Sequence, residues 1–444
     1  AATPLPTRDR AVTGYVIRRL LWHERLMIAT DRRAYGRYFA AQRYEPPEDA
    51  LLIGARIVPG VGQPAFVYYS LGSSGFRYSY PLKWFPASTV KLAASVGALM
   101  TLHKLGLSGA ARVHFTEPGG TYTGPVEALY REALLHSNND CYNRLMMIAG
   151  FDAINGTLLD TRWGLPYMTL QSRYGRIHPG SSLRRSPDIV YIEGKRRGTI
   201  ASRYGNARFP QCASVANCVA FFELQEVLRR VVLHHELPTR ERFPIATRDV
   251  DKINAILLKA RNRLKPGPRH ALGHQALIYN SVGRIPGRDL LENAYIVDSV
   301  DKRRYLLALL VRFEDRYDPK FLTEKKLARF GEHALRFLIA GKGGLPLQHD
   351  AGRVVVQLTR RGVLGLRVQA AVPGATSLEA WVGREAIAVR AVGEARFELD
   401  MPAPRPGRTT MVTLRARRAG GALHAYRSFG VAKVLTSGSA PREM

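Results

Sequence analysis

The chain has 444 residues, of which 46% are hydrophobic, so it has enough material for buried cores and is not a disordered chain. Its formal net charge is +30, carried by 13 Lys and 53 Arg against 36 acids. The basic residues are spread in pairs and short clusters without a nucleic-acid motif, so we expect no nucleic-acid partner. No apolar run approaches the roughly 18 residues of a membrane helix, so we expect no transmembrane segment.

The N-terminal part, residues 1–48, is basic, and its patterns over 15–28 and 32–43 are typical of helices. Residues 64–70 and 76–80 resemble two strands joined by a Gly/Ser turn, which predicts a hairpin at the start of the next domain. We expect that domain to extend over residues 49–341, because strand patterns near both of its ends imply one sheet.

Ser88 and Lys91 open a long apolar helix that is predicted over 92–105. Residues three apart share one face of a helix, so the Lys91 amine is expected to point at the Ser88 hydroxyl. That amine accepts a proton only if burial or nearby cations lower its pKa well below the free value of about 10.4. For an isolated Ser-x-x-Lys match, the alternative is an ordinary helix start with Ser88 as its N-cap.

A second polar cluster, Ser137-Asn138-Asn139, lies between helices predicted at 126–135 and 141–148. Later in the chain, a predicted strand carries Ser281 and Gly283. The other predicted strands and helices of this domain are 292–298, 304–311, 213–234, 248–263 and 321–339.

These residues resemble the motifs of the penicillin-recognising serine hydrolases, the superfamily of class A β-lactamases and DD-peptidases, whose signature is S-x-x-K, S-D-N and K-T-G. Ser88 and Lys91 match the first motif, Ser137 and Asn139 match the outer positions of the second, and Asn138 stands where the family usually has Asp. The resemblance covers about 250 residues and implies an α/β (α+β) fold, with an antiparallel sheet flanked by helices and a helical subdomain.

The resemblance also implies roles for these residues. Ser88 is expected to attack an amide, ester or β-lactam carbonyl of a small-molecule or peptide substrate, while Lys91 and Ser137 move protons. The implied substrate-binding residues are Asn139, Ser281 and Gly283, and the implied oxyanion hole consists of the backbone N–H groups of Ser88 and Arg284.

One departure from the family is Ser281, which stands where the third motif has a lysine that helps to bind the substrate carboxylate. Arg284, Arg288 or His274 are candidates to supply the missing charge. Nothing in the sequence places any of them at the site.

A second departure concerns the Glu on a loop with which class A β-lactamases hydrolyse their acyl-enzyme. Residues 167–186 contain no acid, and the nearest ones, Asp188 and Glu193, are typical of surface positions. We therefore expect either a serine hydrolase that forms an acyl-enzyme at Ser88, or a non-catalytic or weakly catalytic protein that binds the envelope or peptidoglycan on the same fold.

Three cysteines are present, and the six-residue spacing of Cys212 and Cys218 predicts a local disulfide with Cys141 left over as a small buried residue. His270 and His274 have helical metal-ligand spacing but no third ligand nearby. We therefore assign no metal and no cofactor.

A Gly-rich segment at 341–346 marks the last boundary, and residues 350–437 resemble a small β-sandwich that is either an accessory module or a structural cap. Its predicted strands are 353–358, 365–368, 377–382, 395–399, 409–415 and 425–431. The first residues, Ala1-Ala2, are as expected after removal of a signal peptide, so we expect a periplasmic or secreted bacterial protein. There, the basic charge favours an anionic cell-envelope polymer as a partner.

Overall fold

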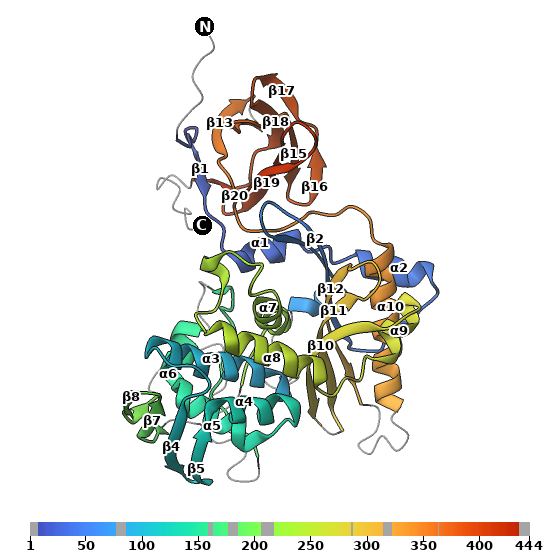
Figure 1. Cartoon of the computed structure of the whole chain (residues 1–444). Helices are drawn as coiled ribbons and strands as arrows, with labels where there is room; N and C mark the ends of the chain where they lie inside the picture. Colours follow the sequence, from blue (N-terminus) through green and yellow to red (C-terminus); the bar gives the residue numbers. More distant parts are fainter. Residues whose placement is uncertain are drawn as a thin grey trace, which may run out of the picture. The chain divides into compact units, whose positions relative to one another are not determined.

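Two units, each with its own antiparallel strand pairs, make up the chain, as the computed structural model shows (Figure 1). One unit comprises Ala1–Asp31, Val58–Tyr68 and Gly343–Met444, and the other comprises Arg32–Ile57 and Tyr69–Lys342. The residues that the structure describes are 8–76, 86–158, 163–175, 185–205, 217–285, 287–313, 322–362 and 364–434.

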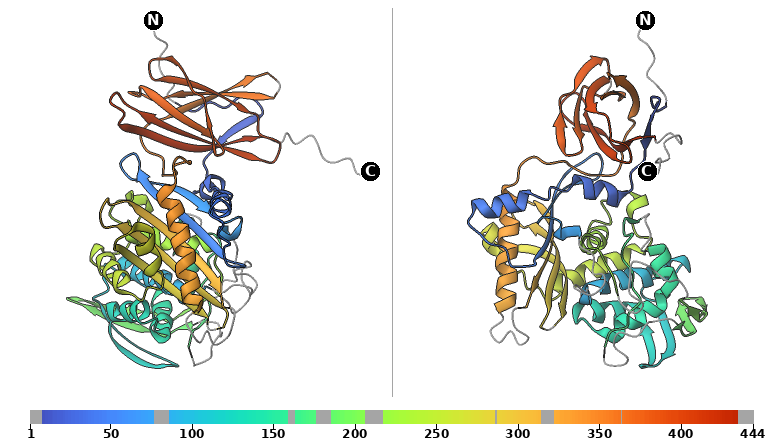
Figure 2. Two further views of the ribbon diagram at one scale, coloured as in Figure 1. Left: turned by 90° about the vertical axis from the view of Figure 1, so that its right-hand side faces the viewer. Right: turned by 180° about the vertical axis from the view of Figure 1, so that it is seen from behind.

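The larger unit is organised by an antiparallel sheet. In spatial order its strands include β10 (Ala276–Ile285), β11 (Asp289–Asp298), β12 (Arg304–Arg312) and β2 (Leu51–Pro59), which belongs to this unit up to Ile57. The helices α7 (Phe221–Val232) and α10 (Leu322–Ala340) pack against β11 and β12. Figure 2 shows α10 lying over one face of the sheet. This cover explains why β11 and β12 are buried along almost their whole length.

A helical block surrounds α3 (Lys91–Lys104), whose side chains are buried on nearly every side. A helix that is apolar all round belongs at the centre of a domain, and α3 packs against α4 (Val126–Leu135) and α5 (Asn139–Ala149). The remaining helices and turns are α2 (Ala34–Ala41), α6 (Phe151–Ala153), α8 (Thr247–Lys259), α9 (Pro266–Leu272), η1 (Ser74–Phe76), η2 (Ala87–Val90), η3 (Ile154–Leu158) and η5 (Thr239–Glu241).

Two small sheets complete this unit. One has four strands in the order β5 (Gly120–Pro125), β4 (Arg112–Glu117), β7 (Ile189–Glu193) and β8 (Arg196–Ile200), and the other pairs β6 (Arg185–Ser186) with β9 (Arg203–Tyr204).

The smaller unit contains a β-sandwich whose two sheets share one apolar core. The first sheet consists of β1 (Tyr15–Arg18), β20 (Leu423–Lys433), β19 (Thr409–Arg417), β15 (Ser377–Val382) and β16 (Glu385–Ile387). The second consists of β13 (Val355–Arg361), β14 (Gly365–Ala371), β18 (Arg396–Pro402) and β17 (Arg390–Gly393). The structure therefore has the expected mixed fold, an α/β (α+β) unit and a small all-β unit.

In the N-terminal segment, helix α2 (Ala34–Ala41) lies within the predicted helical pattern at 32–43, whereas the pattern at 15–28 is helical only in part. Residues 15–18 form strand β1, which pairs with β20 from Tyr15 opposite Lys433 to Arg18 opposite Gly430, and only α1 (Trp22–Ala29) within 15–28 is helical. The physical reason is tertiary: Tyr15 and Ile17 pack against the sandwich core, so residues up to Asp31 belong to the smaller unit.

The structure also differs from the prediction of a hairpin formed by residues 64–70 and 76–80. Residues 64–70 are strand β3, but its neighbour in the sheet is β2, which the sequence analysis missed. Residues 74–76 are the 3₁₀ turn η1, and 77–80 lie outside the described residues. Gly54 interrupts the apolar pattern of β2, and it is required because the Tyr35 hydroxyl occupies the space that a Cβ would fill.

No helix in the described part of the chain combines the length and the apolar character that crossing a bilayer requires.

Strand β10 lies at the edge of its sheet and beside η2, the turn that leads into α3. The closest approach is at Gly283, where a Cβ would lie 3.2 Å from the Ala87 Cβ, the Pro86 carbonyl oxygen and the Thr89 Cγ2. The absence of a side chain at Gly283 therefore sets how closely the strand and the turn approach each other.

We expect Gly283→Ala to lower the free energy of unfolding by about 1–3 kcal/mol, because overpacking forces the strand and the turn apart. Urea denaturation of the full chain measures this change. Gly36→Ala is the matched control: no atom lies within 4 Å of its added Cβ, and alanine is favoured over glycine by about 0.5–1 kcal/mol within a helix such as α2. Equal stability of Gly283→Ala and the parent chain would contradict the close packing.

Candidate active site

The turn that carries Ser88, the predicted nucleophile, is called the nucleophile turn. It is a 3₁₀ turn that continues directly into a helix. Ser88 lies in η2, and Lys91 is the first residue of α3. Because residues three apart lie one above the other in such a turn, Lys91 Nζ comes within 2.9 Å of Ser88 Oγ. Ala87 has a φ of 48°, a left-handed conformation that costs an alanine about 1–2 kcal/mol. The backbone thus bends immediately before Ser88.

Four oxygen atoms surround the Lys91 amine. Nζ lies 2.9 Å from Ser88 Oγ, 2.9 Å from Ser137 Oγ and 2.8 Å from Asn139 Oδ1, and it also donates to the Ser137 carbonyl oxygen. The Ser137 carbonyl oxygen and the Asn139 amide oxygen are acceptors only, so they accept the hydrogen bonds of both N–H groups of a neutral amine. The lone pair of that amine then faces the two hydroxyl groups, which is the geometry of a base that accepts a hydroxyl proton.

Burial lowers the pKa of Lys91 from 10.5 to about 7, and Cys141 opposes this shift. Lys91 is only 1% exposed. The atoms within hydrogen-bond distance of Nζ are hydroxyl, carbonyl and amide oxygens, and none of them belongs to a carboxylate. Desolvation without a counter-charge disfavours the ammonium form. A large fraction of Lys91 is therefore neutral near pH 7, as the sequence analysis required of a base.

The junction of α4 and α5 supplies the second hydroxyl. Ser137 has a φ of 56°, and its Oγ donates to Ser88 Oγ at 2.7 Å. The Asn138 side chain instead caps α5 by accepting a hydrogen bond from the Cys141 N–H at 3.0 Å. The cap aligns the helix so that its first residue, Asn139, faces Lys91.

The strand predicted to correspond to the third motif is β10, with Ser281 buried and Gly283 against the nucleophile turn. Side chains two apart on a strand point to the same face, so Ser281 shares the face of Gly283. Arg284 points to the other face, is exposed, and stacks its guanidinium 5.4 Å from the centre of the Phe313 ring.

The two other candidates for the missing positive charge have acidic partners. His274 Nε2 lies 2.6 Å from Asp298 Oδ1, and Arg288 Nε lies 3.2 Å from Asp289. His274 lies two residues before the start of β10, and the seven strand steps from Ala276 to Gly283 span roughly 23 Å. Its position is therefore at the opposite end of the strand from the nucleophile turn.

Tyr174 is a residue at the site that the sequence analysis missed. Its hydroxyl donates to the Ala87 carbonyl oxygen at 3.0 Å, and its ring stacks on Tyr142 with centroids 4.7 Å apart. Asn143 holds its backbone on both sides: Nδ2 donates to the Tyr174 carbonyl at 2.7 Å, and Oδ1 accepts from the Tyr174 N–H at 3.0 Å. The only sequence signal was its place in the acid-free segment after the second motif.

The acids considered for deacylation have structural roles. Asp188 accepts from the Ser202 N–H at 2.6 Å, and Glu193 accepts from the Ser108 N–H at 2.7 Å. A third acid, Glu117, is buried but forms ion pairs with Arg144 at 3.1 Å and Arg173 at 2.7 Å.

Cys141 is a free, buried thiol, and burial raises its pKa to about 11, so it is an inert neighbour of the site. Cys218 is disulfide-bonded, while Cys212 lies outside the described residues. Within the described ranges, no group of three metal-binding side chains comes together.

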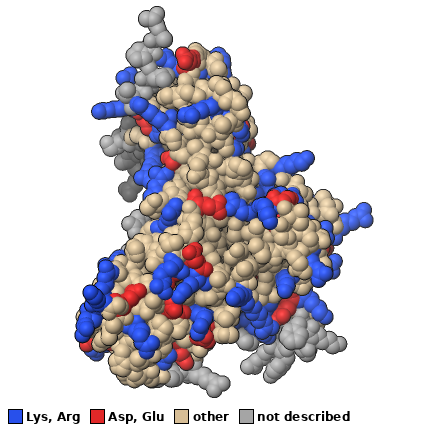
Figure 3. Space-filling model, viewed as in Figure 1, with Lys and Arg blue, Asp and Glu red and all other residues tan. Residues whose placement is uncertain are grey.

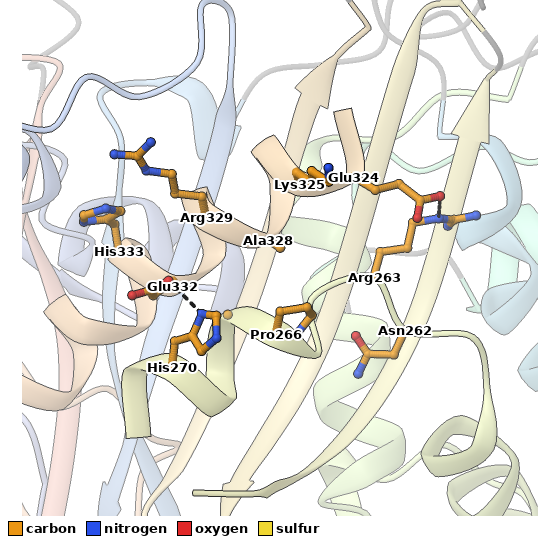
Figure 4. Close-up of a pocket in the computed structure, with 11 residues that line it drawn as sticks. Asn262, Arg263, Pro266, His270, Glu324, Lys325, Ala328, Arg329, Glu332 and His333 are labelled. Atoms are coloured by element: carbon orange, nitrogen blue, oxygen red, sulfur yellow. Dashed lines mark hydrogen bonds and ion pairs between the residues drawn. The ribbon is translucent and has the colours of Figure 1, made fainter. Parts of the chain in front are cut away.

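A cavity of about 700 Å³ lies between α9 and α10, apart from the residues described above (Figure 4). Its charged side chains partly neutralise one another: Arg263 Nε lies 2.9 Å from Glu324, and His270 Nδ1 lies 3.4 Å from Glu332. None of its lining residues belongs to the Ser88–Lys91 cluster.

No protein-family model matches the chain, and no curated protein matches it. Among solved structures, the chain is similar to PBP-A, at 15% identity over 75% of this chain and 99% of that one, with a TM-score of 0.43. It is similar to a class A β-lactamase from Bacteroides cellulosilyticus, at 13% identity over 70% and 99% of the two chains, with a TM-score of 0.42. A β-lactamase from Desulfarculus baarsii is 14% identical over 71% and 99%, with a TM-score of 0.44.

Proposed function

We propose that the protein is a serine acyl-transfer enzyme of the β-lactamase-like type, with Ser88 as its nucleophile. The observation that carries this proposal is the contact of Ser88 Oγ with the buried Lys91 amine, whose pKa is lowered to about 7. A serine hydroxyl is a weak nucleophile until a base takes its proton. Hydrolysis of amide, ester or β-lactam substrates would follow from this chemistry.

In the proposed reaction, neutral Lys91 takes the Ser88 proton, either directly or through Ser137, whose Oγ lies 2.7 Å from Ser88 Oγ and 2.9 Å from Nζ. Ser88 Oγ then bonds to the carbonyl carbon of the substrate. When the bond to the leaving group breaks, the proton passes through Ser137 to that group, and an acyl ester remains on Ser88.

The proposed oxyanion hole consists of the backbone N–H groups of Ser88 and Arg284. An edge strand leaves alternate N–H groups without a partner strand, and β10 is such a strand next to the nucleophile turn. Asn139, Ser281 and Gly283 would then contact the substrate. Because these donors are mostly backbone groups or neutral side chains, the proposal requires no lysine in the third motif.

The alternative is a binding protein of the cell envelope on the same fold, and it is favoured by the structural roles of Asp188 and Glu193, the acids considered for deacylation. Figure 3 shows Lys and Arg side chains scattered over the visible face, with acidic side chains between them. A periplasmic or secreted location and weak attraction to anionic envelope polymers are part of either proposal.

We expect a fluorescent penicillin or a fluorophosphonate to add its mass covalently to the parent chain and not to Ser88→Ala, because Ser88 Oγ is the proposed nucleophile and lies 2.9 Å from the Lys91 amine. Intact-mass spectrometry measures the adduct. Ser95→Ala is the matched control, because Ser95 is a fully buried serine one turn further along α3 that donates to the Lys91 carbonyl. If neither probe labels the folded parent chain, the binding-protein alternative is the better one.

The rate of labelling should depend on pH through Lys91. Its lowered pKa of about 7 means that the amine is protonated and inactive as a base below that pH. We expect the rate to rise by about tenfold per pH unit between pH 5 and 6.5 and to level off above about 7.5. Stopped-time labelling in buffers of constant ionic strength measures this profile. A midpoint near 10 would show that Lys91 retains an ordinary pKa.

A further inference from the structure

The sheet formed by β5, β4, β7 and β8 lies at the margin of the larger unit (Figure 1). Side chains along a strand alternate between its two faces. One face is buried, since Val113, Phe115 and Ile189 are at most 2% exposed. By alternation and register, the other face consists of residues that are all exposed: Arg112, His114, Thr116, Thr121, Thr123, Val190, Ile192, Arg197 and Thr199. Within the described part of the chain, this second face is therefore open to solvent.

Two aliphatic side chains lie at the centre of this open face. Ile192 and Val190 point outward from β7 and are 53% and 44% exposed. The register of the sheet places Ile192 between Arg112 on β4 and Arg197 on β8. Lys195, in the turn between β7 and β8, is exposed as well. Neighbouring exposed apolar residues with a polar rim are typical of a surface that binds a partner.

The open face carries positive charge. Arg112 and Arg197 are the arginines that these strands direct to it, whereas Glu117 and Glu193 alternate to the buried face. There Glu117 pairs with two arginines, and Glu193 accepts a backbone N–H at 2.7 Å. Asp188, which precedes β7, accepts another backbone N–H at 2.6 Å. Cations therefore outnumber acids on the open face, which favours an anionic partner.

The position of the aliphatic pair selects among anionic partners. Strand β7 has β4 on one side and β8 on the other, so an extended peptide cannot pair with its backbone. A second copy of this chain would place arginine against arginine. A soluble polyanion attracts the cations but leaves Val190 and Ile192 in water. A membrane surface with anionic lipids satisfies both, because headgroup phosphates pair with arginine and the acyl boundary accepts aliphatic side chains.

We propose that the open face is a membrane-contact surface for anionic phospholipid. Ile192 and Val190 insert at the level of the headgroups, and Arg112 and Arg197 bind phosphate oxygens on either side of Ile192. These side chains leave the same face of adjacent strands, so all four can reach one plane together. The contact does not depend on the chemistry proposed for Ser88, so either proposal can fail without the other.

The test is sedimentation of the full chain with vesicles of phosphatidylcholine and phosphatidylglycerol in equal parts, compared with vesicles of phosphatidylcholine alone. We expect binding to the anionic vesicles only. Arg112→Ala/Arg197→Ala should weaken this binding by about tenfold or more, since one basic residue near an anionic surface contributes about fivefold. Val190→Ser/Ile192→Ser should weaken it by at least about fivefold through loss of apolar burial.

The control is Leu258→Ser/Lys259→Ala, which removes an exposed leucine and an exposed lysine from α8 and should bind as the parent chain does. Circular dichroism checks the fold of each variant, and either test variant is sufficient by itself. The inference is overturned if the parent chain binds neither kind of vesicle, or if a folded test variant binds as tightly as the parent. Loss of polyglutamate binding in the arginine variant, with full vesicle affinity in the serine variant, would identify a site for soluble polyanions and also overturn it.

Discussion

Lys91 carries its amine into the interior of the helical block, and the rest of the site is arranged around that buried group. Burial lowers the pKa of this amine from 10.5 to about 7, which corresponds to a free-energy cost on the order of several kcal/mol for the charged form. The neutral amine carries no such desolvation penalty, because its N–H groups and its lone pair all face oxygen atoms. The 3₁₀ turn before α3 and the left-handed backbone of Ser137 both serve to bring these oxygens to the amine.

The sequence was sufficient for the parts of the structure that depend on local spacing. The long apolar run after Lys91 predicted α3, and the periodic segments predicted α4 and α10 to within a few residues. The contact of Ser88 with Lys91 follows from a separation of three residues. Ser137 was located because a polar cluster between two helices marks a junction, although its distance from Ser88 depends on how the helices pack.

Features that depend on contacts between distant residues were not predictable in the same way. Strand β1 forms because Ile17 packs on a core built by residues more than 300 positions later, and the local pattern resembled a helix. Val190 and Ile192 are exposed apolar residues in β7, so the alternation of that strand did not indicate a buried face. Tyr174 joins the site only because Asn143 and Tyr142 hold its segment against α5.

The excess of arginine over acid has a consequence for the chemistry available near Ser88. Glu117 is a buried acid, and both of its oxygens accept hydrogen bonds from the guanidinium groups of Arg144 and Arg173. Its carboxylate therefore serves these two ion pairs. A buried amine, in contrast, becomes a base through desolvation alone. In the proposed function, the Lys91 amine is therefore the base for formation of the acyl-enzyme, while Glu117, Asp188 and Glu193 are engaged elsewhere and do not serve its hydrolysis.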